Sequence, residues 1–290
     1  LAIMESATMM LKTMDKGAYL DIDRQTADTL YRRLSVESAL QYAIRHRTLN
    51  VYYQPICSVQ TGKIVGAEAL VRLYDTRLGN IPPEEFIIVA EQMGMIKEVG
   101  EVVIEITSKF VADNRLWERN VGMMHINLST LQCMEYKLSE HILATFEHYG
   151  VPADMFSFEI TESAAIASEA QLLNTMNELI PHGVKFAMDD YGSGYSNSST
   201  IIRFPFHAIK IDKSMLWGST GSEKARVIYC NTVNMIRQMN LQVISEGVET
   251  SEQAELLKRL GVDYVQGFYF SRPLPSEKFL QYLAEQNSEA

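Results

Sequence analysis

From Val51 onward, short apolar or β-branched runs alternate with longer amphipathic segments. The short runs predict strands, and several are apolar at successive positions, as in strands that are buried on both faces. The expected strands are residues 51–59, 64–73, 121–128, 156–161, 184–190, 208–212, 242–246 and 263–270. About eight strands alternating with helices is the rhythm of an α/β fold closed into a TIM-like (β/α)8 barrel. An open doubly wound sheet is the alternative, although residues 57–62 lack the glycine-rich phosphate turn that it requires.

Local signals mark the ends of several expected helices. Residues 168–171 and 250–253 both match the capping box, in which two side chains satisfy unpaired backbone donors. The helix after the first of these boxes carries one apolar stripe, and Pro181 ends it. Gly150 and Gly261 stand where a left-handed residue stops a helix.

The chain before Val51 is helical in pattern, over residues 4–14 and 27–45. We expect residues 1–33 to form a helical tail or linker of an upstream domain, and residues 34–290 to form the barrel with this N-terminal helical extension. The chain begins with Leu1 and shows no signal-peptide pattern, so we expect a piece of a longer protein.

The composition indicates the cellular compartment and the class of binding partner. The three cysteines are scattered and odd in number, which is typical of a reducing cytoplasm rather than of a disulfide framework. No apolar run approaches the roughly 20 residues of a membrane helix, so any membrane anchor is expected in parts outside this chain. A net charge of -10 argues against binding of a DNA or RNA polymer. A phosphate-bearing ligand still fits if metal cations lie between it and the protein.

Polar side chains interrupt or end nearly every expected strand. They are Glu68, Asn127, Glu159, Glu162, Asp189, Asp190, Lys210, Asp212, Glu246, Glu249 and Gln266. Any one of them alone is most simply a helix cap or an ion-pair partner. A charge beside an apolar run is costly unless it is paired or bound to a metal. Because strand ends meet at the mouth of a barrel, we expect the set to lie together there.

The chemistry of this set points to a divalent cation. The acids far outnumber the single lysine, so their mutual repulsion calls for a cation. All the candidate metal-ligand atoms are carboxylate or amide oxygens, and the histidines are scattered along the chain, which favours Mg²⁺ or Mn²⁺ over zinc. Adjacent Asp189 and Asp190 would let a carboxylate bridge two metals about 4 Å apart, an arrangement that activates water against a phosphodiester. The residues alone also allow a Mg²⁺-dependent barrel lyase or aldolase with Lys210 as base or Schiff-base amine.

At these positions the chain resembles the EAL-domain family of cyclic di-GMP phosphodiesterases. The matching motifs are residues 53–56 (YQPI), 68–72 (EALVR), 81–87 (IPPEEFI), 127–129 (NLS), 159–162 (EITE), 189–196 (DDYGSGYS), 210–212 (KID), 246–250 (EGVET) and 266–268 (QGF). The resemblance runs from about residue 34 to 285. Tyr191 stands where the family often has Phe, and Ser193 where it often has Thr. Residues 1–33 resemble the tail of a GGDEF-type domain.

The resemblance implies a metal-dependent hydrolysis of cyclic di-GMP to linear pGpG, with two Mg²⁺ or Mn²⁺ ions per active site. One metal would be held by Glu68, Asn127, Glu159 and Asp189, and the second by Asp189, Asp190 and Glu246. Lys210 would orient the attacking water, with Glu246 as an alternative general base. Glu162 would hold the loop 189–196, and Asp212 would assist either metal or water.

Substrate contacts are implied as well, at Gln54, Leu70, Arg72, Glu249 and Gln266. The expected partners are cyclic di-GMP, a second copy in a homodimer, and upstream GGDEF-type or sensory domains fused to this chain. The alternative within the family is a catalytically silent cyclic di-GMP receptor. Such a receptor should lack one of the metal ligands or Lys210, and the sequence retains them all.

Overall fold

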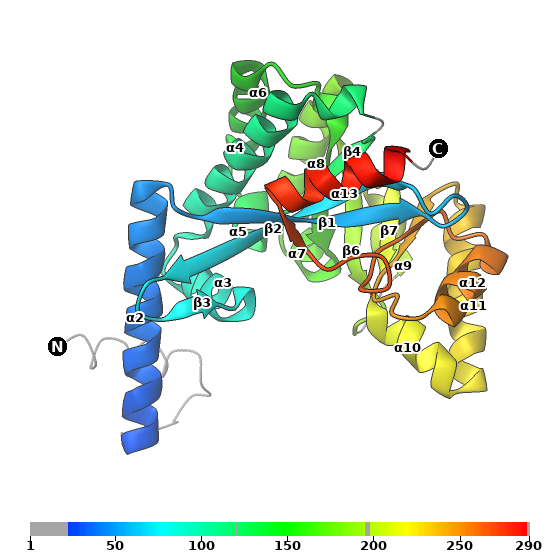
Figure 1. The fold of residues 1–290 in the computed structure, drawn as a ribbon, viewed down its shortest axis with the longest axis horizontal. Helices are drawn as coiled ribbons and strands as arrows, with labels where there is room; N and C mark the ends of the chain where they lie inside the picture. Colours follow the sequence, from blue (N-terminus) through cyan, green and yellow to red (C-terminus); the bar gives the residue numbers. More distant parts are fainter. Residues whose placement is uncertain (1–22, 120, 195–197, 289–290) are drawn as a thin grey trace. The chain divides into compact units, whose positions relative to one another are not determined.

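The computed structural model describes residues 23–119, 121–194 and 198–288 (Figure 1). The helix expected over residues 4–14 lies outside these residues. The chain divides into two compact units: a smaller unit of Leu1–Asn50 and Val71–Val102, and a larger unit of Val51–Leu70 and Val103–Ala290. Among the helices that the structure describes, none is both long enough and apolar enough to cross a membrane.

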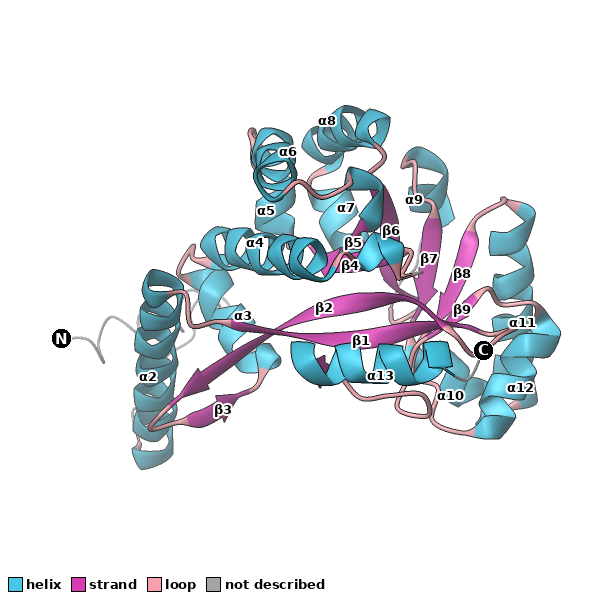
Figure 2. Cartoon of the chain, turned by 45° about the horizontal axis from the view of Figure 1, so that its top comes forward, coloured by secondary structure: helices cyan, strands magenta, loops and turns pink. Residues whose placement is uncertain are grey.

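In the described part of the chain, eight strands close into the expected barrel (Figure 2). In order around it they are β1 (Asn50–Ser58), β2 (Ile64–Asp75), β4 (Met123–Asn127), β5 (Phe156–Thr161), β6 (Lys185–Tyr191), β7 (Ala208–Ile211), β8 (Gln242–Ser245) and β9 (Tyr264–Val265). Going round the barrel from β2 through β4 to β9, each strand is parallel to the next, and β1 closes the ring by pairing with both β2 and β9. The predicted (β/α)8 class is therefore confirmed.

The expected alternation of strands and helices fails at the first connection of the barrel, between β1 and β2. Strand β1 runs antiparallel to β9, and a short turn rather than a helix joins β1 to β2, closed by the amide of Ser58 donating to Lys63 O at 2.9 Å. The last expected strand, 263–270, is also wrong beyond Val265. There the chain turns at Gly267, which lies too close to the backbone of Val248 for any larger residue. A further strand, β10 (Leu274–Pro275), then pairs antiparallel with β1.

Helices surround the strands on the outside of the barrel (Figure 2). They are α4 (Ile96–Asn114), α5 (Thr130–Cys133), α6 (Leu138–Tyr149), α7 (Glu162–Ala167), α8 (Glu169–Leu179), α9 (Ser198–Arg203), α10 (Lys213–Gly221), α11 (Glu223–Gln238), α12 (Ser251–Leu260) and α13 (Ser276–Ser288), with 3₁₀ turns η1 (Leu116–Glu118), η2 (Ala153–Met155) and η3 (Ile180–His182). Figure 1 shows α10, α11 and α12 grouped together and α6 beside α8, in agreement with their contacts.

The predicted helix signals are confirmed except for one capping box. Gly150 and Gly261 both adopt the left-handed conformation after α6 and α12. Thr250 and Gln253 form the expected box at the start of α12. Ser168 forms no such box, because α7 runs almost directly into α8 and its hydroxyl donates to Ala164 O at 2.6 Å instead. The serine therefore satisfies the end of one helix rather than the start of the next.

The interior of the barrel changes from apolar to charged along the strands. Ile56, Ala187, Ala208 and Ile244 form a fully buried apolar cluster from four different strands. Side chains two residues apart on a strand share a face. The charged residues that come two positions after this cluster, Asp189, Lys210 and Glu246, therefore lie one layer further toward the carboxyl ends of the strands.

The smaller unit contains α2 (Arg24–His46), β3 (Gly79–Ile81) and α3 (Pro83–Gln92). Strand β3 pairs antiparallel with the end of β2. Arg32 on α2 forms two hydrogen bonds with Glu85 on α3, at 2.6 and 2.9 Å. The helix expected over residues 27–45 is confirmed as part of α2. It continues through residue 33, and the domain boundary expected there stays a prediction.

Candidate active site

Lys210 lies at the centre of the charged layer, with four carboxylates around its ammonium group. Its Nζ is 2.7 Å from Glu246 Oε1, 2.8 Å from Glu159 Oε2, 3.2 Å from Asp189 Oδ1 and 3.3 Å from Glu68 Oε2. The lysine side chain is 1% exposed. We call these five residues the carboxylate cage. One positive charge against four acids leaves an excess of negative charge in a buried place.

Glu68 on β2 is held by three donors. Asn127 Nδ2 donates to its Oε1 at 2.7 Å, and Gln266 Nε2 donates to its Oε2 at 2.7 Å, which Lys210 also approaches. Gln266 contacts Gln54 Oε1 as well, at 3.1 Å, so β1, β2 and the turn after β9 are joined across the barrel. Gln266 Oε1 is buried and accepts no hydrogen bond from the residues that the structure describes.

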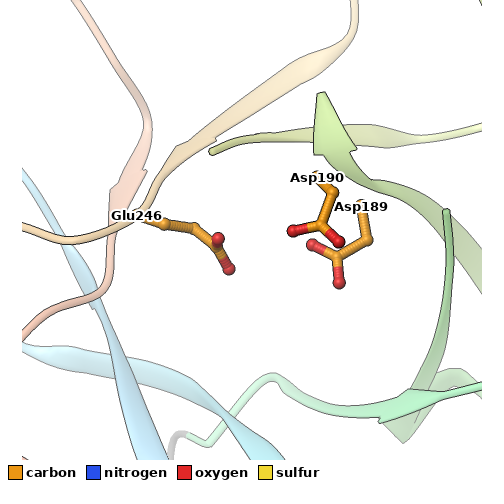
Figure 3. A group of neighbouring side chains, drawn as sticks. All are labelled: Asp189, Asp190 and Glu246. Atoms are coloured by element: carbon orange, nitrogen blue, oxygen red, sulfur yellow. The ribbon is translucent and has the colours of Figure 1, made fainter. Parts of the chain in front are cut away.

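A bulge in β6 brings the two adjacent aspartates together. The pairing of β6 with β7 shifts between Met188 and Tyr191, and Asp190 takes a left-handed φ of 55°. Successive strand residues normally face opposite sides, and a bulge re-aims one of them. The side chains of Asp189, Asp190 and Glu246 consequently point toward one another (Figure 3), with one oxygen of each within 4.8 Å of the others.

This group fits a divalent cation by its donor chemistry. All three residues offer carboxylate oxygens, the donors that Mg²⁺ and Mn²⁺ prefer. Asp189 Oδ1 is buried and, although near Lys210, accepts no hydrogen bond within the described residues. A buried carboxylate oxygen that accepts no hydrogen bond is costly even beside an ammonium group, and a bound cation would reduce that cost.

Burial and crowding shift the pKa values in the cage. Burial raises the pKa of Glu159 well above its usual value, although Lys210 opposes this. Burial likewise raises the pKa of Glu246 to about 8. Next to the cage, burial raises the pKa of Asp190 as well, with neighbouring Asp189 adding to the effect. Burial alone would lower the pKa of Lys210, but the carboxylates around it raise it well above the usual value. The lysine is thus a fixed positive charge.

Glu68 differs from Glu159 and Glu246, the two acids of the cage whose pKa is raised. Burial would raise its pKa, but Lys210 and the hydrogen bonds from Gln266 and Asn127 outweigh burial and lower it. Glu68 is therefore held as an anion more firmly than Glu159 or Glu246.

Two further predicted residues lie at helix starts. Thr161, not Glu162, caps α7, through a hydrogen bond from Ala164 N at 3.3 Å. Glu162 instead accepts a hydrogen bond from Thr200 Oγ1 of α9 at 3.3 Å. Asp212 caps α10 by accepting from the backbone of Ser214 at 2.9 Å. Its predicted catalytic role stays a prediction.

A cavity of about 240 Å³ opens beside the cage. Gln54, Leu70, Glu246, Glu249 and Gln266 line it, together with the aromatic rings of Trp217 and Phe268. The predicted substrate-contact residues of the larger unit therefore surround one cavity. Arg72 belongs to the smaller unit, where its guanidinium donates to Val71 O at 2.9 Å, and its predicted substrate contact stays a prediction.

The structure adds a residue that the sequence analysis missed. His125 on β4 is buried, and its Nδ1 lies 2.8 Å from Glu159 Oε1. Burial, and then Lys210, lowers its pKa well below the usual value, so the ring is neutral. Its signal in the sequence is its place two residues before Asn127, which puts both side chains on the same face of the strand.

The fold and this acidic layer define a (β/α)8-barrel protein with a group of carboxylates that could hold a cation at the carboxyl ends of its strands. A family model of the EAL domain matches residues 37–273. The chain therefore belongs to the EAL-domain family.

Individual relatives agree with this assignment. The signaling protein YkoW of Bacillus subtilis is 34% identical over the whole chain and 36% of its own length. The bifunctional diguanylate cyclase/cyclic di-GMP phosphodiesterase MucR of Pseudomonas aeruginosa is 29% identical over 97% of the chain and 41% of its own length. The chain thus spans well under half of these relatives. The solved PaMucR phosphodiesterase in complex with c-di-GMP has a TM-score of 0.79 and 30% identity, over 84% of this chain and 99% of that one.

Proposed function

We propose that this chain is a metal-dependent phosphodiesterase that hydrolyses cyclic di-GMP to linear pGpG. The observation that carries the proposal is the carboxylate cage next to Asp190, with a buried Asp189 oxygen that is ion-paired to Lys210 at 3.2 Å but accepts no hydrogen bond within the described residues. The phosphodiesterase activity of MucR, which shares the family, adds support. The reaction adds one water across one of the two phosphodiester bonds and opens the ring.

Two Mg²⁺ or Mn²⁺ ions would be held by the ligands inferred from the sequence. Glu68, Asn127, Glu159 and Asp189 would bind one ion, and Asp189, Asp190 and Glu246 the other. When bound, the ions would lower the pKa of the attacking water and neutralise the charge that develops on the phosphate.

Lys210 would orient the attacking water by hydrogen-bond donation. Because its pKa is raised well above the usual value, it keeps its proton and does not act as the base. Glu246, 2.7 Å from Lys210 and lining the cavity, is the candidate proton acceptor. Gln54, Leu70, Glu249 and Gln266 would contact the dinucleotide in that cavity, and Arg72 would bind a phosphate.

The other hypotheses fit the site less well. A silent receptor has no need of a complete ligand set, and this chain carries every one of the inferred ligands. A Schiff-base lyase needs an amine whose pKa is lowered. The pKa of Lys210 is raised, so the lyase hypothesis loses its nucleophile.

The direct test is incubation with cyclic di-GMP and separation of the products by chromatography. Linear pGpG should form with Mg²⁺ or Mn²⁺. Ca²⁺ should bind without supporting turnover, because its longer bonds and looser geometry misplace the water. Full activity in the presence of a chelator would refute the metal mechanism, and tight binding without product would favour the receptor.

Glu68→Ala and Arg72→Ala should separate chemistry from binding. Glu68→Ala removes an inferred metal ligand and should abolish hydrolysis while weakening substrate binding only in part. Arg72→Ala should mainly raise KM, since a guanidinium–phosphate contact already forms in the ground state. Glu255→Ala, an exposed acid on α12, is the matched control and should change neither quantity. A loss confined to kcat in Arg72→Ala would show that its role is misassigned.

Glu162→Ala should leave the barrel folded, cut activity steeply and raise the metal concentration required. Its bond to Thr200 joins α7 to the helix that follows the loop 189–196, which begins with the aspartate pair. Melting temperature and metal titration of the same variant distinguish this role from a purely structural one. A lower melting temperature with unchanged metal dependence and turnover would reject it.

We also propose a setting for the enzyme. The three cysteines are free, which suits the reducing cytoplasm. Because the chain spans well under half of its relatives, we propose that residues 1–33 connect the barrel of residues 34–290 to an upstream GGDEF-type or sensory domain. A homodimer is expected from the family resemblance, and analytical ultracentrifugation would test it.

A further inference from the structure

We propose that His125 is a positioning residue that fixes the metal-binding orientation of Glu159. The inference rests on the proposed function, in which Glu159 is a metal ligand. It adds a residue that is not itself a ligand and that acts from the side of the cage facing away from the barrel mouth.

The geometry at Glu159 leaves each of its oxygens with a separate partner. Oε2 accepts from Lys210 at 2.8 Å, and Oε1 lies 2.8 Å from His125 Nδ1. The side chain of Glu159 is fully buried, and that of His125 is 5% exposed. With Glu159 ionised, Nδ1 carries the proton and donates it. Two donors on opposite oxygens fix the plane of the carboxylate.

The strand register explains why the histidine is in place. Strands β4 and β5 are parallel, with Asn127 opposite Glu159 and His125 opposite Ser157. His125 and Asn127 share a face of β4, so one supplies a donor to Glu159 and the other a donor to Glu68. Two residues of one strand thus hold two of the three glutamates around Lys210.

A second cavity lies behind the histidine. It has a volume of about 290 Å³ and is lined by His125, Lys185 and His207, among others, near the amino ends of the strands. The other donors in its lining have their own places: His207 donates to Phe186 O, Gln242 donates to the Tyr264 hydroxyl, and Lys185 is exposed. Among the described residues, His125 is the one that forms a hydrogen bond with Glu159 Oε1, so its loss leaves this oxygen without its donor. The carboxylate is then free to turn about its last bond, which is a soft rotation, and to place both oxygens on Lys210.

The test compares His125→Leu with His125→Asn. The two side chains branch at the same carbon, but only Asn offers an N–H near the position of Nδ1. Mn²⁺ affinity, measured by calorimetry, should fall roughly 10–100-fold in His125→Leu, which is typical for loss of a partner of a metal ligand. The value of kcat at a fixed, subsaturating Mn²⁺ concentration should fall by a similar factor, with KM for cyclic di-GMP little changed. His125→Asn should recover most of both losses.

His207→Leu is the matched control. It removes a second histidine from the same cavity, one whose Nδ1 donates to the backbone of Phe186 at 2.7 Å rather than to the cage. It should leave Mn²⁺ affinity unchanged.

Equal Mn²⁺ affinity in wild type and His125→Leu would overturn the proposal, and so would an equal loss in His125→Leu and His207→Leu. If His125→Leu fails to fold, as judged by circular dichroism, His125→Asn and His125→Ala replace the pair, and equal affinities in those two would overturn it as well. A wild-type chain that binds Mn²⁺ but leaves cyclic di-GMP intact would refute the proposed function instead.

Discussion

Replacing Lys210 by Met should expose the charge imbalance of the carboxylate cage. Each carboxylate lies 2.7–3.3 Å from the ammonium. At an effective dielectric constant of about 20, each contact is worth roughly 5–6 kcal/mol before desolvation is subtracted. Desolvation of the buried lysine offsets most of this gain. The measured net cost of removing one partner of a buried ion pair is about 3–5 kcal/mol.

We therefore expect Lys210→Met to lose about 3–5 kcal/mol of unfolding free energy in chelator at neutral pH. The assay is urea denaturation followed by circular dichroism. Lys278→Met, at an exposed lysine of α13, is the control and should change stability by less than about 0.5 kcal/mol. Added Mn²⁺ should stabilise the Lys210 variant more than the wild type, because the cation replaces the lost charge.

The loss of unfolding free energy in Lys210→Met should also become smaller as the pH falls. The pKa values of Glu159 and Glu246 are raised in the folded chain even with Lys210 present. A raised carboxyl pKa favours folding at low pH, and that contribution is lost as pH rises through the folded value. The variant should therefore approach wild-type stability on acidification. A variant as stable as wild type in chelator at neutral pH would refute the idea that the lysine holds the cage together.

Three further predictions concern stability. Tyr229→Phe should cost about 1–3 kcal/mol because it leaves Ser245 Oγ, 2.7 Å away and fully buried, without its partner; Ser245→Ala in the same chain should recover part of this in a double-mutant cycle. Gly247→Ala should cost at least about 1 kcal/mol in urea denaturation, because φ is 68° and the new Cβ would lie 2.3 Å from Lys213 Cβ. Burial lowers the pKa of His207 from 6.5 to about 4, so the folded chain favours the neutral ring. The free energy of unfolding should therefore fall by up to about 3 kcal/mol as the pH drops from above 6.5 to about 4, and His207→Leu should lack this pH dependence.

Side-chain alternation is the reason that much of the site could be predicted from the sequence. An acid that follows an apolar run must lie at a strand end, and parallel strand ends meet in a barrel. That reasoning anticipated the meeting of Asp189, Lys210 and Glu246, which are 57 positions apart from first to last. It could not anticipate the bulge that turns Asp190 toward Asp189, because a bulge depends on the pairing of β6 with β7.

The errors have local causes. The segment between the expected strands 51–59 and 64–73 has no room for a helix, so the antiparallel start of the barrel was readable from its length. Ser168 matches a capping box letter by letter, but the preceding helix supplies a nearer carbonyl for its hydroxyl. His125 belongs to no recognisable sequence motif. Its role depends on the pairing of β4 with β5, which brings it next to Glu159.

The antiparallel first strand has a consequence for how the chain folds. Strand β1 is made first, yet its partners β9 and β10 come more than 200 residues later, as the contact between Gln54 and Gln266 at a separation of 212 positions illustrates. Contacts of such long range form slowly, and an unpaired strand edge invites association with other chains. During synthesis one edge of β1 must wait for the last strands. Gln266, which donates to Glu68, arrives with them, so the barrel closes and Glu68 gains this donor in the same late event.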